Sequence, residues 1–370
     1  MAYPTLLDMT PSRYQQVQDE RQSYTLFTLC DDGLEASVVS LAGDEISRWR
    51  QPLNLAGVVT VSQSRAGLHN QPRTNMSTSL INPYADLNGQ WLRGSFHGHC
   101  DENSRCASVP LADSVRDYHA IGAGFVTLTD HDLITDLTAM ADRYGDLCFL
   151  NGFEYSTREN VLFIGPGVGP LYEQPLEDAL AAAADLLTIV CHPKPTGLDS
   201  DYWTREKLCS LGTWADGIEI FNGHYGTATG LANGRWPLYD QFYDELLTAG
   251  HRLWCFANDD FHDPEDFDNA FNMLLVAEAT PTAIVDAAKN GRSYASTGLL
   301  LVDVAVAGNA VSVTVDNECD GSFVGPGGER LSTTTGRTFT YEANDQAYIR
   351  FQAEGENGRI FLQPMFRRDG

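Results

Sequence analysis

Short apolar runs alternate with helical patterns along residues 91–298, and this alternation allows few architectures. Several runs are apolar at every position, as strands of a parallel sheet are when both faces are covered. The strand-like runs are Phe125–Thr129, Leu147–Leu150, Leu187–Cys191, Gly217–Phe221 and Arg252–Phe256. The helical patterns are Leu111–Gly122, Leu133–Tyr144, Leu176–Asp185, Arg205–Leu211, Pro237–Ala249 and Pro281–Asn290. This order predicts an α/β fold with a parallel sheet, either open or closed into a barrel.

Side chains that bind metals follow the strand-like runs. His97 and His99 stand two residues apart, and if residues 94–99 form a strand, both imidazoles face the same side. The residues that follow the other runs are His131, Glu154, His192, Asp260 and His262. Because the carboxyl ends of parallel strands in a barrel lie on one face, we expect these side chains to converge. Imidazoles and carboxylates suit zinc, manganese or iron.

The candidates fall into two groups. Two imidazoles and two carboxylates would make an open metal site, formed by His97, His99, Glu154 and Asp260. The remaining histidines, His131, His192 and His262, are the natural ligands of further ions. Lys194 follows His192 closely and is either a group that binds an anionic substrate oxygen or a solvated side chain.

Composition indicates which kind of partner the protein binds and in which cellular compartment it works. The chain has 370 residues and a net charge of −26, which argues against nucleic acid as a partner. None of the 8 cysteines forms a CxxC pair, and no apolar run is long enough for a membrane span. The N-terminus lacks a signal-peptide pattern. We therefore expect a cytoplasmic protein that acts on a small molecule away from the membrane, with its oligomeric state left open.

The pattern of strand-like, helical and polar segments divides the chain into three regions. Residues 1–90 hold short β-like runs and a polar stretch, and residues 299–370 hold short strands separated by Gly, Asn and Asp. The predicted domains are therefore a small β-rich region at 1–90, a barrel of alternating strands and helices that carries the candidate metal ligands at 91–298, and a β-sandwich-like domain at 299–370. The sequence lacks the GxSxG, phosphate-loop and dinucleotide-binding patterns, so these chemistries are not supported.

Five short motifs occur in order within residues 91–298. They are Phe96-His97-Gly98-His99, Thr129-Asp130-His131, Gly152-Phe153-Glu154, His192-Pro193 and Asp260-Phe261-His262. This order resembles the polymerase and histidinol phosphatase (PHP) superfamily of metal-dependent phosphoesterases. The resemblance implies a distorted (β/α)7 barrel that holds up to three ions. Residues 216–223, residues 291–298 and the β-rich tail look like the carbamate-hydrolase-like branch of that superfamily.

Two positions depart from the family pattern. Ser104 stands where the resemblance leads us to expect a carboxylate ligand, and Asn160 stands where it leads us to expect a histidine. Two further metal sites implied by the resemblance therefore each lack one ligand. One is the site around His192, and the other is the site of His131 with His262. We therefore expect one to three divalent ions (zinc, manganese or iron), with fewer than three favoured.

The leading hypothesis is a metal-dependent hydrolase, a phosphoesterase that attacks a small organic phosphate through a metal-bound hydroxide. His192 or His262 would protonate the leaving group, and Lys194 would bind the substrate's anionic oxygen. One alternative is a carboxyl or carbamate ester hydrolase with the same metal site, favoured by the branch resemblance and by the few basic residues. The other is a degenerate, non-catalytic member that binds a ligand, favoured by the losses at Ser104 and Asn160.

Overall fold

The computed structural model describes residues 23–30, 33–40, 45–52, 79–85, 89–157, 159–193, 203, 205–211 and 215–368. Lys194 lies outside the described residues. The chain divides into two compact units, Met1–Thr74 and Asn75–Gly370. The three-domain division expected from the sequence stays a prediction. In the described part of the chain, no helix combines the length and apolar character that crossing a membrane requires.

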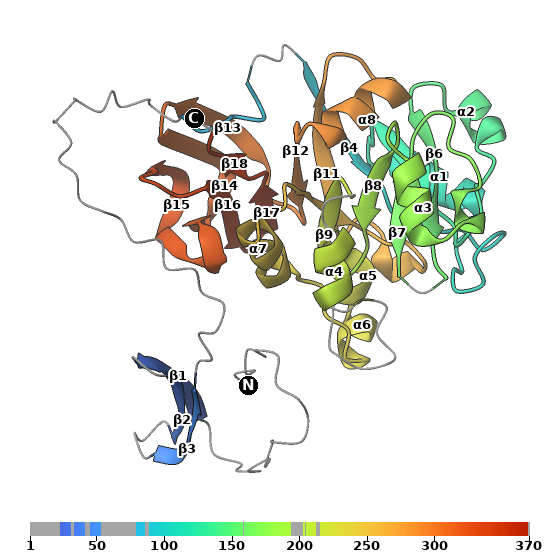
Figure 1. Ribbon diagram of the computed structural model, residues 1–370. Coiled ribbons are helices and arrows are strands. Elements are labelled where there is room, and N and C mark those ends of the chain that lie inside the picture. Colours follow the sequence, from blue (N-terminus) through green and yellow to red (C-terminus); the bar gives the residue numbers. More distant parts are fainter. Residues whose placement is uncertain are drawn as a thin grey trace, which may run out of the picture. The chain divides into compact units, whose positions relative to one another are not determined.

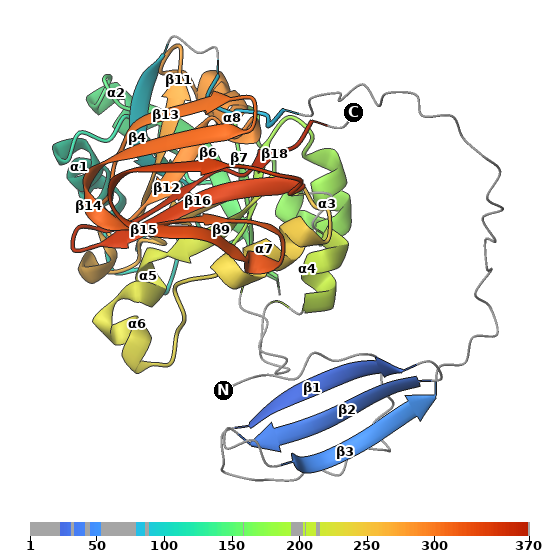
Figure 2. The same ribbon diagram turned by 90° about the vertical axis from the view of Figure 1, so that its left-hand side faces the viewer.

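The first unit contains an antiparallel meander. Its strands are β1 (Ser23–Cys30), β2 (Gly33–Ser40) and β3 (Glu45–Pro52), and β2 pairs with both neighbours. Figure 2 shows the three strands side by side. The β-like runs that the sequence indicates at residues 24–29 and 36–41 overlap β1 and β2.

The second unit is mixed α/β around one large sheet (Figure 1). Seven consecutive neighbours in this sheet run in the order β10-β9-β8-β7-β6-β5-β4. Their bounds are β4 (Gln90–Ser95), β5 (Phe125–Leu128), β6 (Cys148–Tyr155), β7 (Val161–Ile164), β8 (Leu187–Val190), β9 (Gly217–Asn222) and β10 (Trp254–Asn258). The pairings give all of them except β7 the same direction. Six carboxyl ends therefore lie at one edge.

Helices connect these strands, as the alternation of patterns predicts. They are α1 (Leu111–Ala120), α2 (Thr138–Arg143), α3 (Leu176–Ala182), α4 (Arg205–Leu211), α5 (Gly223–Gly226), α6 (Ala228–Ala232), α7 (Asp240–Thr248) and α8 (Pro281–Lys289). Local sequence explains where α8 begins: the Thr280 hydroxyl accepts a hydrogen bond from the Ala283 N–H, and Pro281 occupies the first turn. Strands β5, β7 and β8 are buried at every position, because helices or neighbouring segments cover both faces.

The remaining strands extend the same sheet with antiparallel pairings. They are β11 (Phe271–Val276), β12 (Ser293–Ser296), β13 (Leu301–Ala307), β14 (Ala310–Val324), β15 (Arg330–Glu342), β16 (Tyr348–Gly355), β17 (Gly358–Leu362) and β18 (Met365–Phe366). Strand β11 pairs with β4, and β17 pairs with β12. The C-terminal strands are therefore continuous with the α/β part, and Figure 2 shows them stacked in front of it.

Two amide side chains satisfy the outer edge of β10. The Gln363 side chain accepts a hydrogen bond from the Cys255 N–H at 2.8 Å and donates one to the Cys255 carbonyl at 2.8 Å. The Asn272 side chain makes the same pair of bonds with Ala257, at 3.0 and 2.8 Å. These amides replace a neighbouring backbone at a buried strand edge, where unpaired backbone groups are costly.

The ladder does not close into a barrel. The segments that follow β4 and β10 meet in one isolated parallel bridge between Gly98 and Phe261. Two backbone bonds accompany it, from the His99 N–H to the Phe261 carbonyl and from the Asp260 N–H to the His97 carbonyl. The bridge does not extend into a strand pair among the described residues, so the predicted barrel is not confirmed.

The structure corrects two local expectations. The expected strand Leu147–Leu150 runs on to Tyr155 as β6, and Glu154 lies within it. Gly152 also lies within β6, and a Cβ there would lie 3.0 Å from the Phe163 carbonyl oxygen and 3.1 Å from Thr129 Cγ2. Close approach of two neighbours therefore explains this glycine. Likewise, β4 ends at Ser95, so the two histidines converge from the segment after the strand rather than from the strand itself.

Candidate metal centre

Four side chains converge at the carboxyl edge of the sheet, and we call them the first donor set: His97, His99, Glu154 and Asp260. The two histidines follow β4, Glu154 lies near the end of β6, and Asp260 follows β10. All four are buried. The Nε2 atoms of His97 and His99 lie 3.3 Å apart, and each is 3.4 Å from Glu154 Oε2. Asp260 Oδ1 is 3.0 Å from His97 Nε2 and 3.2 Å from His99 Nε2.

These separations fit the ligand atoms of one metal ion. Ligand atoms placed tetrahedrally at zinc distances of about 2.0–2.1 Å are about 3.3 Å from one another. The five measured separations span 3.0–3.4 Å. Within the described chain, Glu154 Oε2 and Asp260 Oδ1 are buried without a hydrogen bond of acceptable geometry. A divalent cation would satisfy these two buried oxygens, which have no hydrogen bond from a described residue and lie beside two imidazole nitrogens.

Glu219 fixes the orientation of His97. It lies inside β9, fully buried, and its Oε1 is 2.7 Å from His97 Nδ1. Asn258 donates a further bond to Oε1, while Asn222 and the His192 backbone N–H donate to Oε2. The carboxylate therefore holds the proton on Nδ1, which leaves the Nε2 lone pair of His97 directed at the first donor set.

Ser104 and Asp130 fix the orientation of His99. The Ser104 hydroxyl lies 3.3 Å from His99 Nδ1 and donates to Asp130 Oδ1 at 2.6 Å. Asp130 also accepts bonds from the backbone N–H and thiol of Cys100. Its nearest oxygen is 3.9 Å from His99 Nδ1, so Asp130 orients the imidazole through Ser104.

The other predicted histidines lie around the first donor set. His131 follows β5, and its Nδ1 is 2.8 Å from Glu154 Oε2. His192 follows β8, and its Nε2 is 3.3 Å from Glu154 Oε1. His262 stands beside His99, with ring centroids 4.3 Å apart. The structure thus brings the seven predicted metal-ligand residues into one cluster, although their ligand role stays a prediction.

Asn160 occupies the space beside Glu154 as a hydrogen-bond donor. Its side-chain amide donates to Glu154 Oε1 at 2.7 Å, and both residues are buried. The same oxygen, Glu154 Oε1, therefore has a hydrogen-bond donor from Asn160 and lies 3.3 Å from His192 Nε2. The expectation that a further ion near His192 would lack a ligand stays a prediction.

The carboxylates of the first donor set favour positive charge on the neighbouring imidazoles. Burial lowers the pKa of His97, but the charges of Asp260, Glu154 and Glu219 outweigh burial and raise it well above the usual value. Burial raises the pKa of Glu154 and of Asp260, and the neighbouring histidines overcome this and hold both pKa values well below normal. Burial keeps the pKa of His99 low, so that imidazole is neutral. A proton on His97 supplies the charge that a bound cation would otherwise provide.

Two residues of the cluster have strained backbones. Asp260 has φ +52° and His192 has φ +29°, values that residues with a Cβ rarely adopt. Both lie just beyond the ends of their strands, where the chain turns sharply. Strain of this kind persists where the surroundings enforce it, and it concentrates at functional sites.

The sequence reasoning did not identify two nearby groups. Glu219 could have been found, because an acidic residue inside an otherwise apolar, buried strand requires partners. Cys106 gave no such signal, since it lies in the irregular segment between β4 and α1. Partial burial raises the pKa of the Cys106 thiol, but hydrogen bonds to His131 and His262 outweigh this and lower it to about 6.

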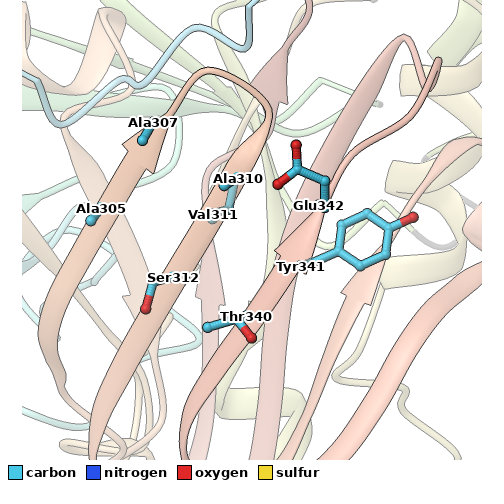
Figure 3. A pocket seen from close by; sticks show the side chains of 8 residues that line it. All are labelled: Ala305, Ala307, Ala310, Val311, Ser312, Thr340, Tyr341 and Glu342. Atoms are coloured by element: carbon cyan, nitrogen blue, oxygen red, sulfur yellow. The ribbon is translucent and has the colours of Figure 1, made fainter.

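A depression of about 330 Å³ lies far from these residues, on the C-terminal strands. Figure 3 shows its lining, which comes from β13, β14 and β15. Its side chains are Ala305, Ala307, Ala310, Val311, Ser312, Thr340, Tyr341 and Glu342. Only one of them is ionisable at neutral pH, so the depression lacks the convergent polar groups of a binding site.

This chain has only distant similarity to the known proteins with which it was compared. No family model matches the sequence, and no curated protein gives a significant match. A two-domain protein from Bacteroides vulgatus, described as containing a predicted PHP-like metal-dependent phosphoesterase, aligns with 75% of this chain and 88% of its own. Its sequence identity is 18% and the TM-score is 0.44.

An amidohydrolase from Chromobacterium violaceum, solved with sulfate and without metal, aligns with 46% of this chain and 88% of its own. Its identity is 15% and the TM-score is 0.32. Both TM-scores lie below 0.5, so neither similarity identifies a function for this chain.

Proposed function

We propose that this protein is a metal-dependent hydrolase, and specifically a phosphoesterase that acts on a small organic phosphate. The observation that carries the proposal is the convergence of His97 Nε2, His99 Nε2, Glu154 Oε2 and Asp260 Oδ1 at 3.0–3.4 Å. The five motifs that resemble the PHP superfamily support it. The proposal includes the distorted barrel and the cytoplasmic location as expectations.

The first donor set would hold the ion, with Glu219 and Ser104 fixing the two imidazoles from behind. When bound, a divalent cation would make a coordinated water acidic enough to attack and would polarise the substrate's phosphoryl oxygen. The side chains of the first donor set contribute two neutral nitrogens and two carboxylates in a fixed arrangement. Their burial keeps bulk water from competing for these atoms.

We infer that His192 and His262 move protons during hydrolysis. Both are almost fully buried, at 7% and 8% exposed, at the border of the cluster. His262 Nδ1 donates to the Asp260 carbonyl at 2.7 Å, which leaves its Nε2 for an ion or for the leaving group. We propose that one of the two protonates the departing oxygen while the other stays near the metal. Lys194, as a group that binds the substrate anion, remains part of the proposal.

Hydrolysis of a carboxyl or carbamate ester is the second candidate. The observation that favours it is the charge around the site. In the described chain, hydrogen bonds to Glu154, Glu219 and Asp260 come from imidazoles, amides and backbone N–H groups rather than from Lys or Arg. Arg292 is also engaged, in an ion pair with Asp286. A neutral ester needs fewer cations than a phosphate dianion does.

Parallel assays separate the candidates. Protein loaded with zinc or manganese is assayed with p-nitrophenyl phosphate, bis(p-nitrophenyl) phosphate and p-nitrophenyl acetate. The proposal predicts turnover of a phosphoester that His97→Ala lowers by more than about 100-fold, beyond the usual effect of outer partners. The control is His119→Ala, because His119 is partly exposed on α1 and pairs with Asp146. Turnover of the acetate alone favours the second candidate, and bound metal with no turnover of any ester favours a non-catalytic binding protein.

A further inference from the structure

The segment between β9 and α7, residues 223–239, starts at the carboxyl edge of the sheet beside the candidate metal centre. We call it the β9–α7 insertion. At its start, the Asn222 side chain accepts a hydrogen bond from the Tyr225 N–H at 3.0 Å. Near its end, Leu238 forms an antiparallel bridge with Phe221 of β9. Contacts at both ends therefore fix the insertion to the strand that carries Glu219.

Arg235 of this insertion is held on the face of Tyr225. Its guanidinium carbon lies 4.7 Å from the centroid of the tyrosine ring, and its Nη1 donates to the Tyr225 hydroxyl at 3.5 Å. The Arg235 backbone N–H donates to the Gly230 carbonyl at 2.9 Å. Stacking on a ring orients the planar guanidinium and leaves its remaining N–H groups to bind an anion.

Tyr225 also connects Arg235 to the metal centre. The Tyr225 ring contacts the imidazole of His192, with centroids 5.2 Å apart. His192 Nε2 is in turn 3.3 Å from Glu154 Oε1. A chain of contacts therefore runs from Arg235 through Tyr225 and His192 to the first donor set.

The charge of Arg235 is not neutralised within the described parts of the chain. The contacts of its side chain there are those with Tyr225, and no carboxylate lies within ion-pair distance. In contrast, Arg93, Arg292 and Arg350 each form an ion pair with an aspartate. The whole chain has a net charge of −26. A guanidinium that is held in place without a carboxylate in so acidic a chain fits an anionic ligand.

The surroundings of Arg235 are apolar. Trp236, the next residue, is 53% exposed, and Leu231 of α6 is 54% exposed. Both are large apolar side chains, and both belong to the β9–α7 insertion. Apolar side chains beside one placed charge are typical of sites that bind a small molecule with an apolar body and a single charged group.

We propose that the β9–α7 insertion binds the leaving group of the substrate and that Arg235 pairs with an acidic group on it. This inference rests on the proposed function, because it names the substrate class of the same site. The scissile ester lies at the first donor set, and the leaving group extends past His192 and Tyr225 toward Arg235. Trp236 contacts its apolar part. The substrate class is therefore a small phosphate ester whose leaving group is apolar and carries a negative charge.

The test compares two phosphate esters that differ in the charge of the leaving group. They are phenyl phosphates with a carboxylate or an aminomethyl group at the para position. Metal-loaded full-length protein is assayed by phosphate release, and the ratio of the two kcat/KM values gives the charge preference. The variants are Arg235→Glu and, as a matched control, Arg143→Glu. Arg143 is also exposed and lies 5.2 Å from the centroid of a tyrosine ring, that of Tyr144, but it ends α2.

The inference predicts that the wild-type protein prefers the carboxylate and that Arg235→Glu lowers this preference by at least about 10-fold, the effect of losing one hydrogen bond between charged groups. Arg143→Glu keeps the preference, although it changes the net charge equally. Far-ultraviolet circular dichroism verifies that both variants are folded.

Three results overturn this inference and leave the proposed function standing. They are turnover without a preference for the carboxylate, a preference that Arg235→Glu leaves unchanged, and a preference that Arg143→Glu lowers as much as Arg235→Glu does. Failure of the metal-loaded wild type to hydrolyse either phosphate overturns both the inference and the proposed function.

Discussion

At the scale of single residues, the site depends on which imidazole nitrogen is held. Four histidines of the cluster have Nδ1 engaged by a different partner. The partners are Glu219 for His97, Ser104 for His99, Ser156 for His131 and the Asp260 carbonyl for His262. Each ring therefore presents Nε2, so the orientation of the ligands is built into the protein before an ion arrives.

Glu219→Gln tests this orientation. The substitution keeps the size of the side chain but removes the charge that holds the proton on His97 Nδ1. It also puts an amide N–H₂, which is a donor, where the carboxylate accepts hydrogen bonds. The groups that donate to Glu219 are the side chains of Asn222 and Asn258 and the His192 backbone N–H. We expect zinc affinity to fall by about 10- to 100-fold, as measured by competition with a chelator of known affinity.

The control for this change is Glu278→Gln, at an exposed position after β11. It removes the same charge from the chain without touching the site. An affinity of Glu219→Gln equal to that of Glu278→Gln would show that Glu219 does not position His97.

Much of the candidate site could be predicted from the order of residue types along the chain. Histidines and acids directly after apolar strands meet in space because parallel strands end at one edge. Glu219 was missed because it precedes its strand's end. Cys106 was missed because no regular element fixes where its segment goes, so only the folded chain shows that it reaches His131.

At the scale of elements, the strand edge at β10 needs special support. Its outward backbone groups are satisfied by the side chains of Asn272 and Gln363 instead of a neighbouring strand. Because β10 leads directly into Asp260 and His262, these two amides also help to hold part of the site in place.

Gln363→Leu removes one of these supports. The Cys255 N–H and carbonyl then lose their partners in a buried setting, and each unsatisfied group costs about 1–3 kcal/mol. We expect a loss of at least about 2 kcal/mol in the free energy of unfolding, measured by urea denaturation. Gln241→Leu, on the exposed side of α7, is the control and should change stability by less than about 0.5 kcal/mol. Equal stability of the two variants would mean that Gln363 does not support β10.

Element types were more predictable than their ends. The expected helix Arg205–Leu211 matches α4, and the expected run Phe125–Thr129 ends one residue beyond β5. The apolar run was expected to end at Leu150, before Gly152, so β6 was predicted too short. The glycine there allows close packing instead, which a single sequence does not distinguish from a turn.

At the scale of the whole molecule, strand direction gathers the site. Six strands of the second unit share one direction, and the candidate ligands lie at or just beyond the carboxyl ends of β4, β5, β6, β8 and β10. Residues spread over a long stretch of chain therefore meet in one cluster. An ion bound by the first donor set would join three segments, namely those at the ends of β4, β6 and β10.

Metal binding should therefore stabilise the fold. Free zinc at 100 times its Kd contributes about 2.7 kcal/mol, because it binds the folded state. For a unit of this size, that corresponds to a rise in Tm of about 4 °C. The rise should be absent in a His97→Ala/His99→Ala double variant and should reverse when a chelator is added to the wild type. Differential scanning calorimetry at fixed pH measures both, and an equal rise in the double variant would place the stabilising ion elsewhere.

The most direct test of the metal centre is an anomalous difference map at the zinc edge, from crystals of the zinc-loaded protein. We predict a peak about 2.0–2.2 Å from His97 Nε2, His99 Nε2, Glu154 Oε2 and Asp260 Oδ1. A zinc-loaded crystal with no peak within ligand distance of these four atoms would contradict the account.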